Sequence, residues 1–556
     1  MVSIAASILE TITISSIFPF MSLVSNPEQI YGKYYKVLYD VFGFSSPVHF
    51  IVALGIVIII LFIIKTVFNT FSTHVAHSFG NYVVKNTKTK LLINFLHQKY
   101  IYYLRDNRSS VIELHNNVNH LASAISSLSI IITEIFIVVI MYIVLMLFNW
   151  KIMTAITLFL LVNIVIVQKV IQPRLKRIST NTWSSLGLSH KFLSAIVNNY
   201  KVVKLSSKDK CVDDYGQLSS QFHDNDCKRV VLERQPKNIL ELSGFLIMIG
   251  LVIYQELKHG LESSNSFIPM ISLLMLTFYR LLPSITRIID AKNSILHVTP
   301  IVNKVTEVFA RKKEAVISDK YDIHMKHHLE LKNIRFAYSK NKQILSNVSL
   351  TINQGEHIAF IGSSGSGKST LVDILMGFYD HDEELYHFSG DIAVDGVLLS
   401  DNKLPSWRQS IGYIPQEIYL FDGTVADNIV MNHEYDEAKI ILALKKASIW
   451  EFLEQKEGVH TRVGDSGVML SGGQKQRIGI ARALYNDPDI IVMDEATSAL
   501  DDYTESQIVD ELNNSARDKT IIMIAHRMSS LKNCDRIYKL DKGIVIGEFD
   551  SVSDII

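Results

Sequence analysis

The stretch HIAFIGSSGSGKSTLVDILMGF, residues 357–378, decides the fold of the carboxyl-terminal half of the chain. An apolar strand leads into a glycine-rich turn, and a helix follows the turn. The spacing Gly362-x-x-x-x-Gly367-Lys368-Ser369 is that of a P-loop, and the strand and helix on either side supply the context that this motif requires. The stretch therefore predicts an α/β P-loop domain that binds a nucleoside triphosphate.

Each residue type in this turn suits a phosphate group. Glycines let backbone N–H groups close around the phosphates, and the helix N-terminus adds the positive end of its dipole. We expect Lys368 to reach the β- and γ-phosphates and Ser369 to coordinate Mg²⁺. The predicted ATP-binding residues of the loop are Gly362, Ser363, Ser364, Gly365, Ser366, Gly367, Lys368, Ser369 and Thr370.

A second motif, LSGGQKQR at Leu470–Arg477, resembles the signature sequence of ABC ATPases. The resemblance implies that the signature of one subunit closes over the ATP held by the P-loop of another, through a serine hydroxyl and backbone donors at a helix N-terminus. One chain then holds half of each composite site, so we expect a homodimer with two equivalent ATP sites. The signature residues expected at the nucleotide are Ser471, Gly472, Gly473 and Gln474.

The motif DIIVMDEATSALD, residues 489–501, follows the signature. Its apolar residues predict a buried parallel strand that ends in two carboxylates, Asp494 and Glu495. In the family's pattern, Asp494 binds Mg²⁺ through water and Glu495 polarises the attacking water, a position in which a carboxylate can act as general base. Ser498–Asp501 matches the family's D-loop, which adds Asp501 to the predicted nucleotide site.

Three more residues complete the ATP site that the resemblance implies. His526 in IIMIAHR matches the switch histidine at the γ-phosphate, and Gln416 in IGYIPQ matches the Q-loop residue that senses Mg²⁺. Tyr338 in IRFAY matches the aromatic residue that stacks on adenine. Taken singly, such a histidine is usually structural and such a tyrosine usually packs in a core, but the order and spacing of all the motifs favour the ATP site. The predicted catalytic residues are Glu495, His526, Gln416 and Lys368, and the predicted metal ligands are Ser369, Gln416 and Asp494.

The amino-terminal half is more apolar than the rest and has a different architecture. The chain has 556 residues, of which 48% are hydrophobic, and its formal net charge of zero argues for no nucleic-acid partner. A membrane span needs about 20 mostly apolar residues and must be helical, because lipid leaves no partner for an unpaired backbone group. Six such stretches occur, at 2–25, 49–72, 128–149, 152–173, 239–257 and 266–284.

These features predict an α-helical membrane domain with six spans fused to an ABC ATPase domain, which is the type I ABC exporter fold. The expected boundaries are 1–310 for the membrane domain, 311–327 for a charged linker and 328–556 for the ATPase domain.

The distribution of Lys and Arg orients the predicted bundle. Six of these residues lie between the second and third spans and twelve between the fourth and fifth, so both connections and the N-terminus are expected in the cytoplasm. Polar breaks near Asp106–Ser110 and Lys208–Gly216 would turn the chain there. We expect short helices at these turns to contact an ATPase domain.

The first external connection has an amphipathic pattern. Between Pro27 and Phe42, apolar residues recur at helical spacing, with polar residues on the other side. The pattern predicts a short helix on the outer membrane surface. A helix packed on the bundle fits the same pattern equally well.

Four cations lie within or near the spans at comparable depth: Lys65, Lys237, Arg280 and Arg287. Charges inside spans are costly and tend to face a cavity, so the four predict a basic belt for an anionic headgroup such as pyrophosphate. The alternative is that some extend their side chains to the inner interface. Glu10, in the first span, is expected to pair with one of them.

Three segments resemble bacterial lipid-linked-oligosaccharide flippases of the PglK type: SILETITISSIFPFMSLVS (residues 7–25), NNYKVVKL (198–205) and FYRLLPSITRII (278–289). Members of that family carry an external helix that binds the polyprenyl tail and a basic belt that binds pyrophosphate. The resemblance implies an ATP-driven flippase of an undecaprenyl-pyrophosphate-linked oligosaccharide in the bacterial inner membrane, for protein glycosylation or O-antigen assembly.

Two observations leave other readings open. Lys65 and Lys237 stand where the family pattern has arginine, and lysine lacks the bidentate fork of arginine. A lipid A or multidrug exporter of the same architecture fits the chain as well. An ATP-gated channel or regulator is disfavoured, because such proteins often have a degraded site whereas the catalytic motifs here are intact.

Overall fold

The computed structural model describes residues 2–17, 20, 23–24, 27–106, 108–148, 150–206, 208–259, 264–314, 322–339, 342–381, 384–494, 518–525 and 527–555. The chain divides into two compact units. The membrane unit comprises Met1–Leu96 and Asp106–Arg311, and the ATPase unit comprises His97–Arg105 and Lys312–Ile556. A short segment between the second and third predicted spans therefore folds with the ATPase domain, which the sequence-based boundaries do not include.

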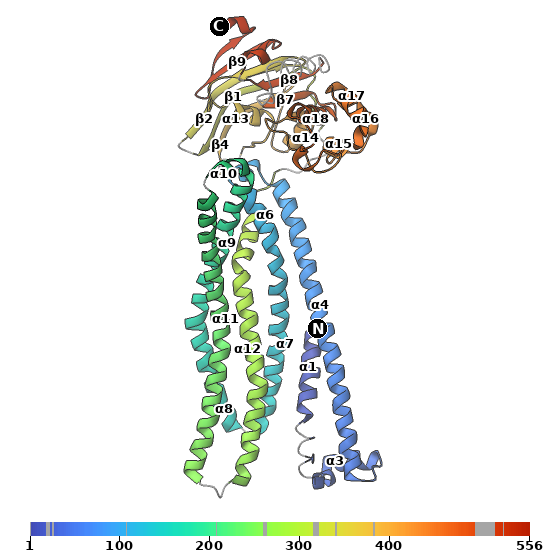
Figure 1. The fold of residues 1–556 in the computed structure, drawn as a ribbon, viewed down its shortest axis with the longest axis vertical. Helices are drawn as coiled ribbons and strands as arrows, with labels where there is room; N and C mark the ends of the chain where they lie inside the picture. Colours follow the sequence, from blue (N-terminus) through green and yellow to red (C-terminus); the bar gives the residue numbers. More distant parts are fainter. Residues whose placement is uncertain are drawn as a thin grey trace. The chain divides into compact units, whose positions relative to one another are not determined.

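The membrane unit is built of long helices that run side by side (Figure 1). Three of them have 46 to 52 residues, far more than the roughly 20 that a bilayer requires, so they extend beyond a membrane. The helices are α1 (Val2–Ser15), α4 (Pro47–His97), α6 (Arg108–Asn117), α7 (Leu121–Phe148), α8 (Trp150–Ile166), α9 (Gln172–Asn198), α10 (Tyr200–Leu205), α11 (Lys208–His259) and α12 (Ser264–Phe309).

The predicted spans fall on these helices. The second, fifth and sixth lie within α4, α11 and α12, and the third falls on the last part of α7. The fourth runs through α8, a π-helix η3 (Val167–Ile171) and the start of α9. Helix α1 covers the first part of the first span, and several of its later residues lie outside the described part of the chain. Among the described residues, three segments are long and apolar enough to cross a membrane: Pro47–His97, Ser110–Ile143 and Thr157–Asn198. The predicted helical class of this half is confirmed.

The predicted amphipathic helix of the first external connection is present in two pieces. A 3-10 helix η1 (Pro27–Tyr31) and helix α3 (Lys33–Val41) meet at Gly32, whose extended backbone begins the second helix. The side chain of Ile30 is buried with Leu23 and Phe50. Other apolar side chains of the segment, Val37, Val41 and Phe42, are exposed, so one part packs on the bundle and another faces outward.

A cluster of aromatic and titratable residues stands where α9, α11 and α12 extend beyond the predicted spans. Trp183 stacks on His297 with 5.1 Å between ring centroids, and its indole N–H donates to the backbone oxygen of His297 at 2.9 Å. The Nδ1 atom of His297 is buried and makes no hydrogen bond within the described part of the chain. Burial, aided by the positive charge of Arg229, lowers the pKa of His297 from 6.5 to about 4.

We predict that this histidine makes the stability of the protein fall in mild acid. The unfolded chain takes up a proton near pH 6.5 while the folded ring stays neutral down to about pH 4, so stability present above pH 6.5 is lost as the pH falls toward 4. The thermal unfolding midpoint should drop by several degrees between pH 7 and pH 5. His297→Phe keeps the stacked ring and removes the titration, so its midpoint should fall less. An equal fall in both proteins would contradict the prediction.

The ATPase unit contains two sheets. A six-stranded sheet has the order β10-β9-β3-β8-β7-β6, and a four-stranded antiparallel sheet has the order β2-β1-β4-β5. The strands are β1 (His328–Ser339), β2 (Lys342–Asn353), β3 (His357–Ile361), β4 (His387–Val394), β5 (Val397–Leu398), β6 (Ile411–Ile414), β7 (Ile490–Asp494), β8 (Thr520–Ile524), β9 (Arg536–Asp541) and β10 (Ile544–Phe549). Strands β3, β6, β7, β8 and β9 run parallel.

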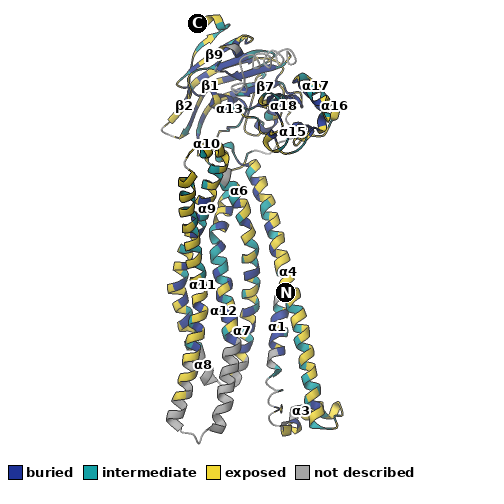
Figure 2. Cartoon of the chain, in the orientation of Figure 1, coloured by how far each residue is buried: buried dark blue, intermediate teal, exposed yellow. Residues whose placement is uncertain are grey.

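The inner strands β3, β7 and β8 of the six-stranded sheet are buried on both faces, as their apolar sequences predict, whereas the edge strand β10 is partly exposed. Successive side chains of a strand point to opposite faces, so Ala359 packs in one core cluster and its neighbours Ile358 and Phe360 in the other. The same alternation holds along β7 and β8. Figure 2 shows these strands as the buried interior of the unit. The helices of this unit are α5 (Tyr100–Arg105), α13 (Lys368–Leu375), α14 (Leu404–Gln409), α15 (Val425–Val430), α16 (Glu437–Lys446), α17 (Trp450–Glu454) and α18 (Gly472–Leu484).

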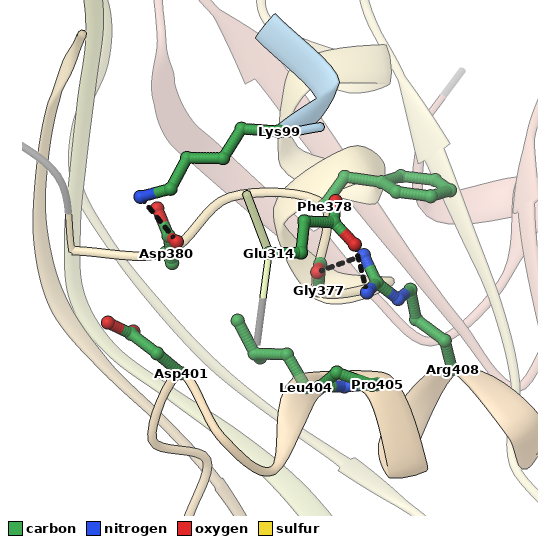
Figure 3. A pocket seen from close by; sticks show the side chains of 9 residues that line it. All are labelled: Lys99, Glu314, Gly377, Phe378, Asp380, Asp401, Leu404, Pro405 and Arg408. Carbon is green, nitrogen blue, oxygen red and sulfur yellow. Dashed lines mark hydrogen bonds and ion pairs between the residues drawn. The ribbon is translucent and has the colours of Figure 1, made fainter. Parts of the chain in front are cut away.

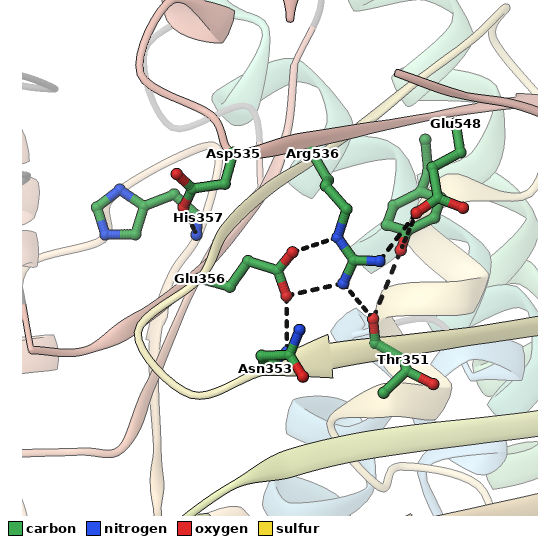
Figure 4. Close-up of polar contacts among 8 residues, drawn as sticks. Thr351, Asn353, Glu356, His357, Asp535, Arg536 and Glu548 are labelled. Atoms are coloured by element: carbon green, nitrogen blue, oxygen red, sulfur yellow. Dashed lines mark hydrogen bonds and ion pairs between the residues drawn. The ribbon is translucent and has the colours of Figure 1, made fainter. Parts of the chain in front are cut away.

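An ion-pair network fixes the start of the P-loop strand β3 (Figure 4). Arg536 pairs with both Glu356 and Glu548 and donates to the backbone oxygen of Thr351. Burial alone would raise the pKa of Glu356, but hydrogen bonds from Arg536 and from the backbone N–H of Asn353 lower it below its ordinary value. The network thereby holds together strands β2, β9 and β10 and the turn that precedes β3.

Candidate functional site

The predicted catalytic residues follow the carboxyl ends of neighbouring parallel strands. Strands β3, β8, β7 and β6 are adjacent in the sheet, and Phe360, Ile524 and Asp494 are in register near their ends. The P-loop follows β3, and the chain reaches Gln416 two residues after β6. The other predicted residues of this edge, Glu495, Asp501 and His526, lie outside the described residues. In an open sheet of this kind, ligands bind outside the carboxyl ends of the strands.

Two glycines of the P-loop stand where no other residue fits. Gly362 has a φ of +146°, and a Cβ atom there would lie 2.1 Å from the backbone oxygen of Leu540. Gly367 has a φ of +104°, and a Cβ atom there would lie 2.8 Å from a methyl group of Leu345. The loop therefore passes close to β9 and β2 and then opens directly into α13.

The side chain of Lys368 closes this loop. It is buried, and its Nζ atom donates to the backbone oxygens of Gly362 at 2.9 Å and Ser363 at 3.1 Å. The buried hydroxyl of Ser366 makes no hydrogen bond to the described residues. A triphosphate fits this cradle, because it would accept hydrogen bonds from the loop and from the N-terminus of α13.

Oxygen donors suited to Mg²⁺ stand beside the cradle. Ser369 is exposed at the first turn of α13, Asp494 ends β7, and Gln416 is exposed beyond β6. The Tyr413 hydroxyl donates to a carboxylate oxygen of Asp494 at 3.5 Å. Hydroxyl, carboxylate and amide oxygens are the ligands that Mg²⁺ prefers, so these residues fit the ion.

A further carboxylate, Asp373 on α13, lies near Asp494 and is not among the residues predicted from the motifs. Burial, together with the negative charge of Asp494, raises the pKa of Asp373 to about 7. Its only signal in the sequence is that it is the single acidic residue of the helix after the P-loop. Two carboxylates near one another favour the binding of a cation, which relieves their repulsion.

Tyr338 lies next to the P-loop helix. Its hydroxyl is 3.3 Å from the hydroxyl of Thr370 and accepts a hydrogen bond from Tyr379 at 3.2 Å. Its ring meets that of Phe336 edge to face. The predicted stacking on adenine stays a prediction.

The signature residues form an exposed helix start. Ser471 caps α18: its hydroxyl accepts from the backbone N–H of Gln474 at 3.3 Å, and the Gln474 side chain accepts from the backbone N–H of Ser471 at 2.9 Å. Ser471 and Gly472 are exposed, so the positive end of α18 is open to a ligand. Lys475 ties this helix to the preceding loop through the backbone oxygen of Ser466.

Helix α5, from the connection between the second and third predicted spans, packs on the residues that follow the P-loop helix α13. Tyr100 stacks on Phe378 with 4.7 Å between centroids, and Lys99 pairs with Asp380 at 2.7 Å. Arg105 donates to the backbone oxygen of Leu385 at 2.8 Å. The expected short helix at this turn is therefore present and contacts the ATPase domain, as predicted.

The start of the linker holds α5 in place (Figure 3). The backbone N–H of Glu314 donates to the oxygen of His97 at 2.8 Å, and the Glu314 carboxylate pairs with Arg408 at 2.5 Å. Arg408 also donates to the backbone oxygen of Gly377, just after α13. A small pocket is lined by Lys99, Glu314, Gly377, Phe378, Asp380, Asp401, Leu404, Pro405 and Arg408.

The four predicted substrate residues lie on three helices. Lys65 of α4 pairs with Glu10 at 3.1 Å, which confirms the predicted pairing of Glu10. Arg287 of α12 pairs with Glu134 at 2.6 Å, and Lys237 of α11 with Glu241 at 3.8 Å. The side chain of Arg280 lies outside the described residues. The basic belt stays a prediction. Three of its four cations have a carboxylate partner in the structure, and the charge pattern of the sequence does not reveal these pairings.

The fold and the site together define a membrane-spanning transport protein driven by an ABC-type ATPase. Sequence comparison agrees: the profile described as ABC transporter transmembrane region matches residues 1–281, and the profile described as ABC transporter matches residues 345–498. The chain belongs to the ABC transporter family. It binds ATP and couples its hydrolysis to transport.

Two relatives are similar over nearly the whole chain, both named ATP-dependent lipid A-core flippase. The protein of Pseudoalteromonas translucida is 30% identical over 89% of this chain and 85% of its own length. The protein of Coxiella burnetii is 29% identical over 89% of this chain and 84% of its own length. A solved bacterial Atm1-family ABC exporter with ATP bound superimposes with a TM-score of 0.81 over 100% of this chain and 95% of that chain, at 21% identity. The predicted type I ABC exporter fold is confirmed.

Proposed function

We propose that this chain is one half of a homodimeric flippase of the bacterial inner membrane that uses ATP to move a phosphate-bearing glycolipid. The observation that carries the proposal is the likeness over 89% of the chain to two lipid A-core flippases. The cations within or near the predicted spans support it, because an anionic headgroup needs fixed positive charge where the dielectric constant is low.

The ATPase cycle follows from the residues at the carboxyl ends of the strands. Lys368 and the loop N–H groups hold the β- and γ-phosphates, and the carboxylate of Glu495 takes a proton from the attacking water. His526 holds the γ-phosphate. Mg²⁺, held by Ser369, Gln416 and Asp494, would neutralise charge on the phosphates.

The homodimer is supported by the signature. The start of α18 is exposed at Ser471 and Gly472, so its backbone N–H groups are open to a ligand that another chain holds. A second copy would bring its P-loop to Ser471 and complete both sites. Binding of ATP would then join the two ATPase domains, and hydrolysis would release them.

Helix α5 offers a route from nucleotide to membrane domain, because Tyr100 stacks at the end of the P-loop helix. We predict that Tyr100→Ala lowers the stimulation of ATP hydrolysis by the transported lipid several-fold while the lipid-free rate stays near that of wild type. The stacked pair is worth only about 0.5–1.5 kcal/mol, so the fold should survive. Tyr100→Phe keeps the ring and is the matched control. Equal stimulation in Tyr100→Ala and Tyr100→Phe would argue against this route.

Two substrates compete. The names of the relatives favour a lipid A-type glycolipid. The second candidate is an undecaprenyl-pyrophosphate-linked oligosaccharide, favoured by the exposed apolar side chains Val37, Val41 and Phe42 of the external helix, which suit a polyprenyl tail.

Flipping in proteoliposomes distinguishes the two. Purified protein is reconstituted with fluorescent lipid A or with undecaprenyl-pyrophosphate-linked N-acetylglucosamine, and ATP-dependent transfer between leaflets is measured. The lipid that is moved identifies the substrate class. We expect Arg280→Ala/Arg287→Ala to abolish flipping, and Arg177→Ala, an exposed arginine on α9, to retain it. Transfer of neither lipid, with ATP hydrolysis stimulated by hydrophobic amines instead, would overturn the proposal in favour of a multidrug exporter.

A further inference from the structure

Two carboxylates are almost completely enclosed within the predicted spans. Glu10 lies on α1 and Glu134 on α7, with side chains 8% and 4% exposed. A charge at such a position is expensive and persists only with a partner. Each carboxylate has one among the predicted belt cations: Lys65 for Glu10 and Arg287 for Glu134.

The two ion pairs differ in the exposure of the cation. The side chain of Lys65 is 17% exposed, and its ammonium also lies over the ring of Phe62. The side chain of Arg287 is 46% exposed although its carboxylate partner is enclosed. In the first pair both Lys65 and Glu10 are largely buried. In the second pair Glu134 is buried, whereas Arg287 is exposed.

An arginine held in this way can bind a phosphate without leaving its partner. A guanidinium carries five N–H donors in a rigid planar fork, and the contact to Glu134 uses one side of it. The remaining donors can form charge-assisted, bidentate hydrogen bonds to a phosphate. Lys65 has one compact ammonium instead of a fork, and its side chain is only 17% exposed between Glu10 and the ring of Phe62, so little of it is open to a phosphate.

The surroundings of Glu134 keep it in place. Ile137 and Met141, three and seven residues further along α7, are buried on the same side of the helix. Helix α7 packs against both α1 and α12. On α12, Ser284 and Ile285 are buried close to Arg287 in the sequence. The carboxylate therefore has little freedom to move away from the guanidinium.

We infer that Glu134 is a positioning residue, which holds Arg287 with its free donors toward the phosphate of the transported lipid, whereas Glu10 and Lys65 form a structural pair between α1 and α4. The inference rests on the proposed function and deepens it, because it separates a substrate-binding cation from a structural one.

The test compares two isosteric variants, Glu134→Gln and Glu10→Gln, in proteoliposomes that contain the fluorescent lipid moved by wild-type protein. For Glu134→Gln we expect the half-maximal lipid concentration for flipping to rise about tenfold, as for loss of one charge-assisted contact, while the maximal rate falls much less. Glu134→Asp keeps the charge and should lie between wild type and Glu134→Gln. For Glu10→Gln we expect a lower thermal unfolding midpoint and an unchanged half-maximal concentration.

The outcomes separate the inference from the function on which it rests. If wild-type protein flips neither fluorescent lipid, the proposed function fails and the inference with it. If wild-type protein flips the lipid and Glu134→Gln has its half-maximal concentration, only the inference fails. Equal rises of the half-maximal lipid concentration in Glu134→Gln and Glu10→Gln would also overturn the inference. If Glu134→Gln does not fold, Glu134→Asp decides: a raised half-maximal concentration at an unchanged melting midpoint supports the inference, and an unchanged concentration overturns it.

Discussion

Lys368→Ala should reduce ATP hydrolysis by about a thousandfold, as expected for loss of a preorganised group at the reacting phosphate. The ammonium is buried and bonded to the P-loop backbone at Gly362 and Ser363, so it is held at the place that the γ-phosphate must reach. Alanine removes the positive charge where negative charge gathers during phosphoryl transfer.

Phosphate release by the reconstituted protein measures this effect. Lys332→Ala is the matched control, because Lys332 is exposed on β1 and pairs only at the surface with Glu330. The control should hydrolyse ATP at the wild-type rate, and both variants should melt near the wild-type temperature. A Lys368→Ala protein that folds and retains more than about a tenth of the activity would contradict the assignment of the cradle.

The contact between Tyr100 and Phe378 links this cradle to a chain segment more than 250 residues earlier in the sequence. The P-loop helix runs from Lys368 to Leu375, and Phe378 follows three residues later, so the helix and a short segment after it connect the phosphate cradle to the contact with α5. Glu314 and Arg408 bind the linker to the same region. These contacts give a structural reason for movement driven by ATP to be transmitted to α5, in the connection between the second and third predicted spans.

The sequence predicts those parts of the fold that depend on short, contiguous motifs. A glycine turn between an apolar strand and a helix, and apolar runs long enough for a bilayer, each have one physical solution, so the two domains and the sheet around the P-loop follow from the chain. The carboxyl ends of β3, β6, β7 and β8 meet for the same reason, since parallel strands expose them at one edge.

Long-range partners could not be predicted in the same way. The charge pattern marks Arg287 as a cation near the end of a span, but the pairing with Glu134 depends on how α12 packs against α7. Nothing in the composition of residues 97–105 separates them from the helices on either side, although they fold with the ATPase domain. Asp373 owes its raised pKa first to its burial in the folded unit and then to the nearby charge of Asp494, and neither is visible in the sequence.

Glu495→Gln should lower ATP hydrolysis by about a thousandfold while ATP binding is kept, because an amide cannot accept the proton of the attacking water. Glu495 directly follows Asp494 at the end of β7, next to the strand that leads to His526. Binding does not need the carboxylate, since the P-loop and Lys368 hold the phosphates. The protein should therefore remain in the ATP-bound closed dimer, with the start of α18 in each chain on the nucleotide of the other.

Two measurements separate loss of chemistry from loss of binding: phosphate release, and retention of a fluorescent ATP analogue after gel filtration. Glu451→Gln, an exposed glutamate on α17, is the matched control and should behave as wild type in both. Adding Ser471→Arg to Glu495→Gln should abolish retention, because the arginine blocks the cap that each chain lends to its partner's triphosphate. Full hydrolysis by Glu495→Gln would remove the carboxylate from the mechanism, and retention that persists with Ser471→Arg would mean that one chain suffices to hold ATP.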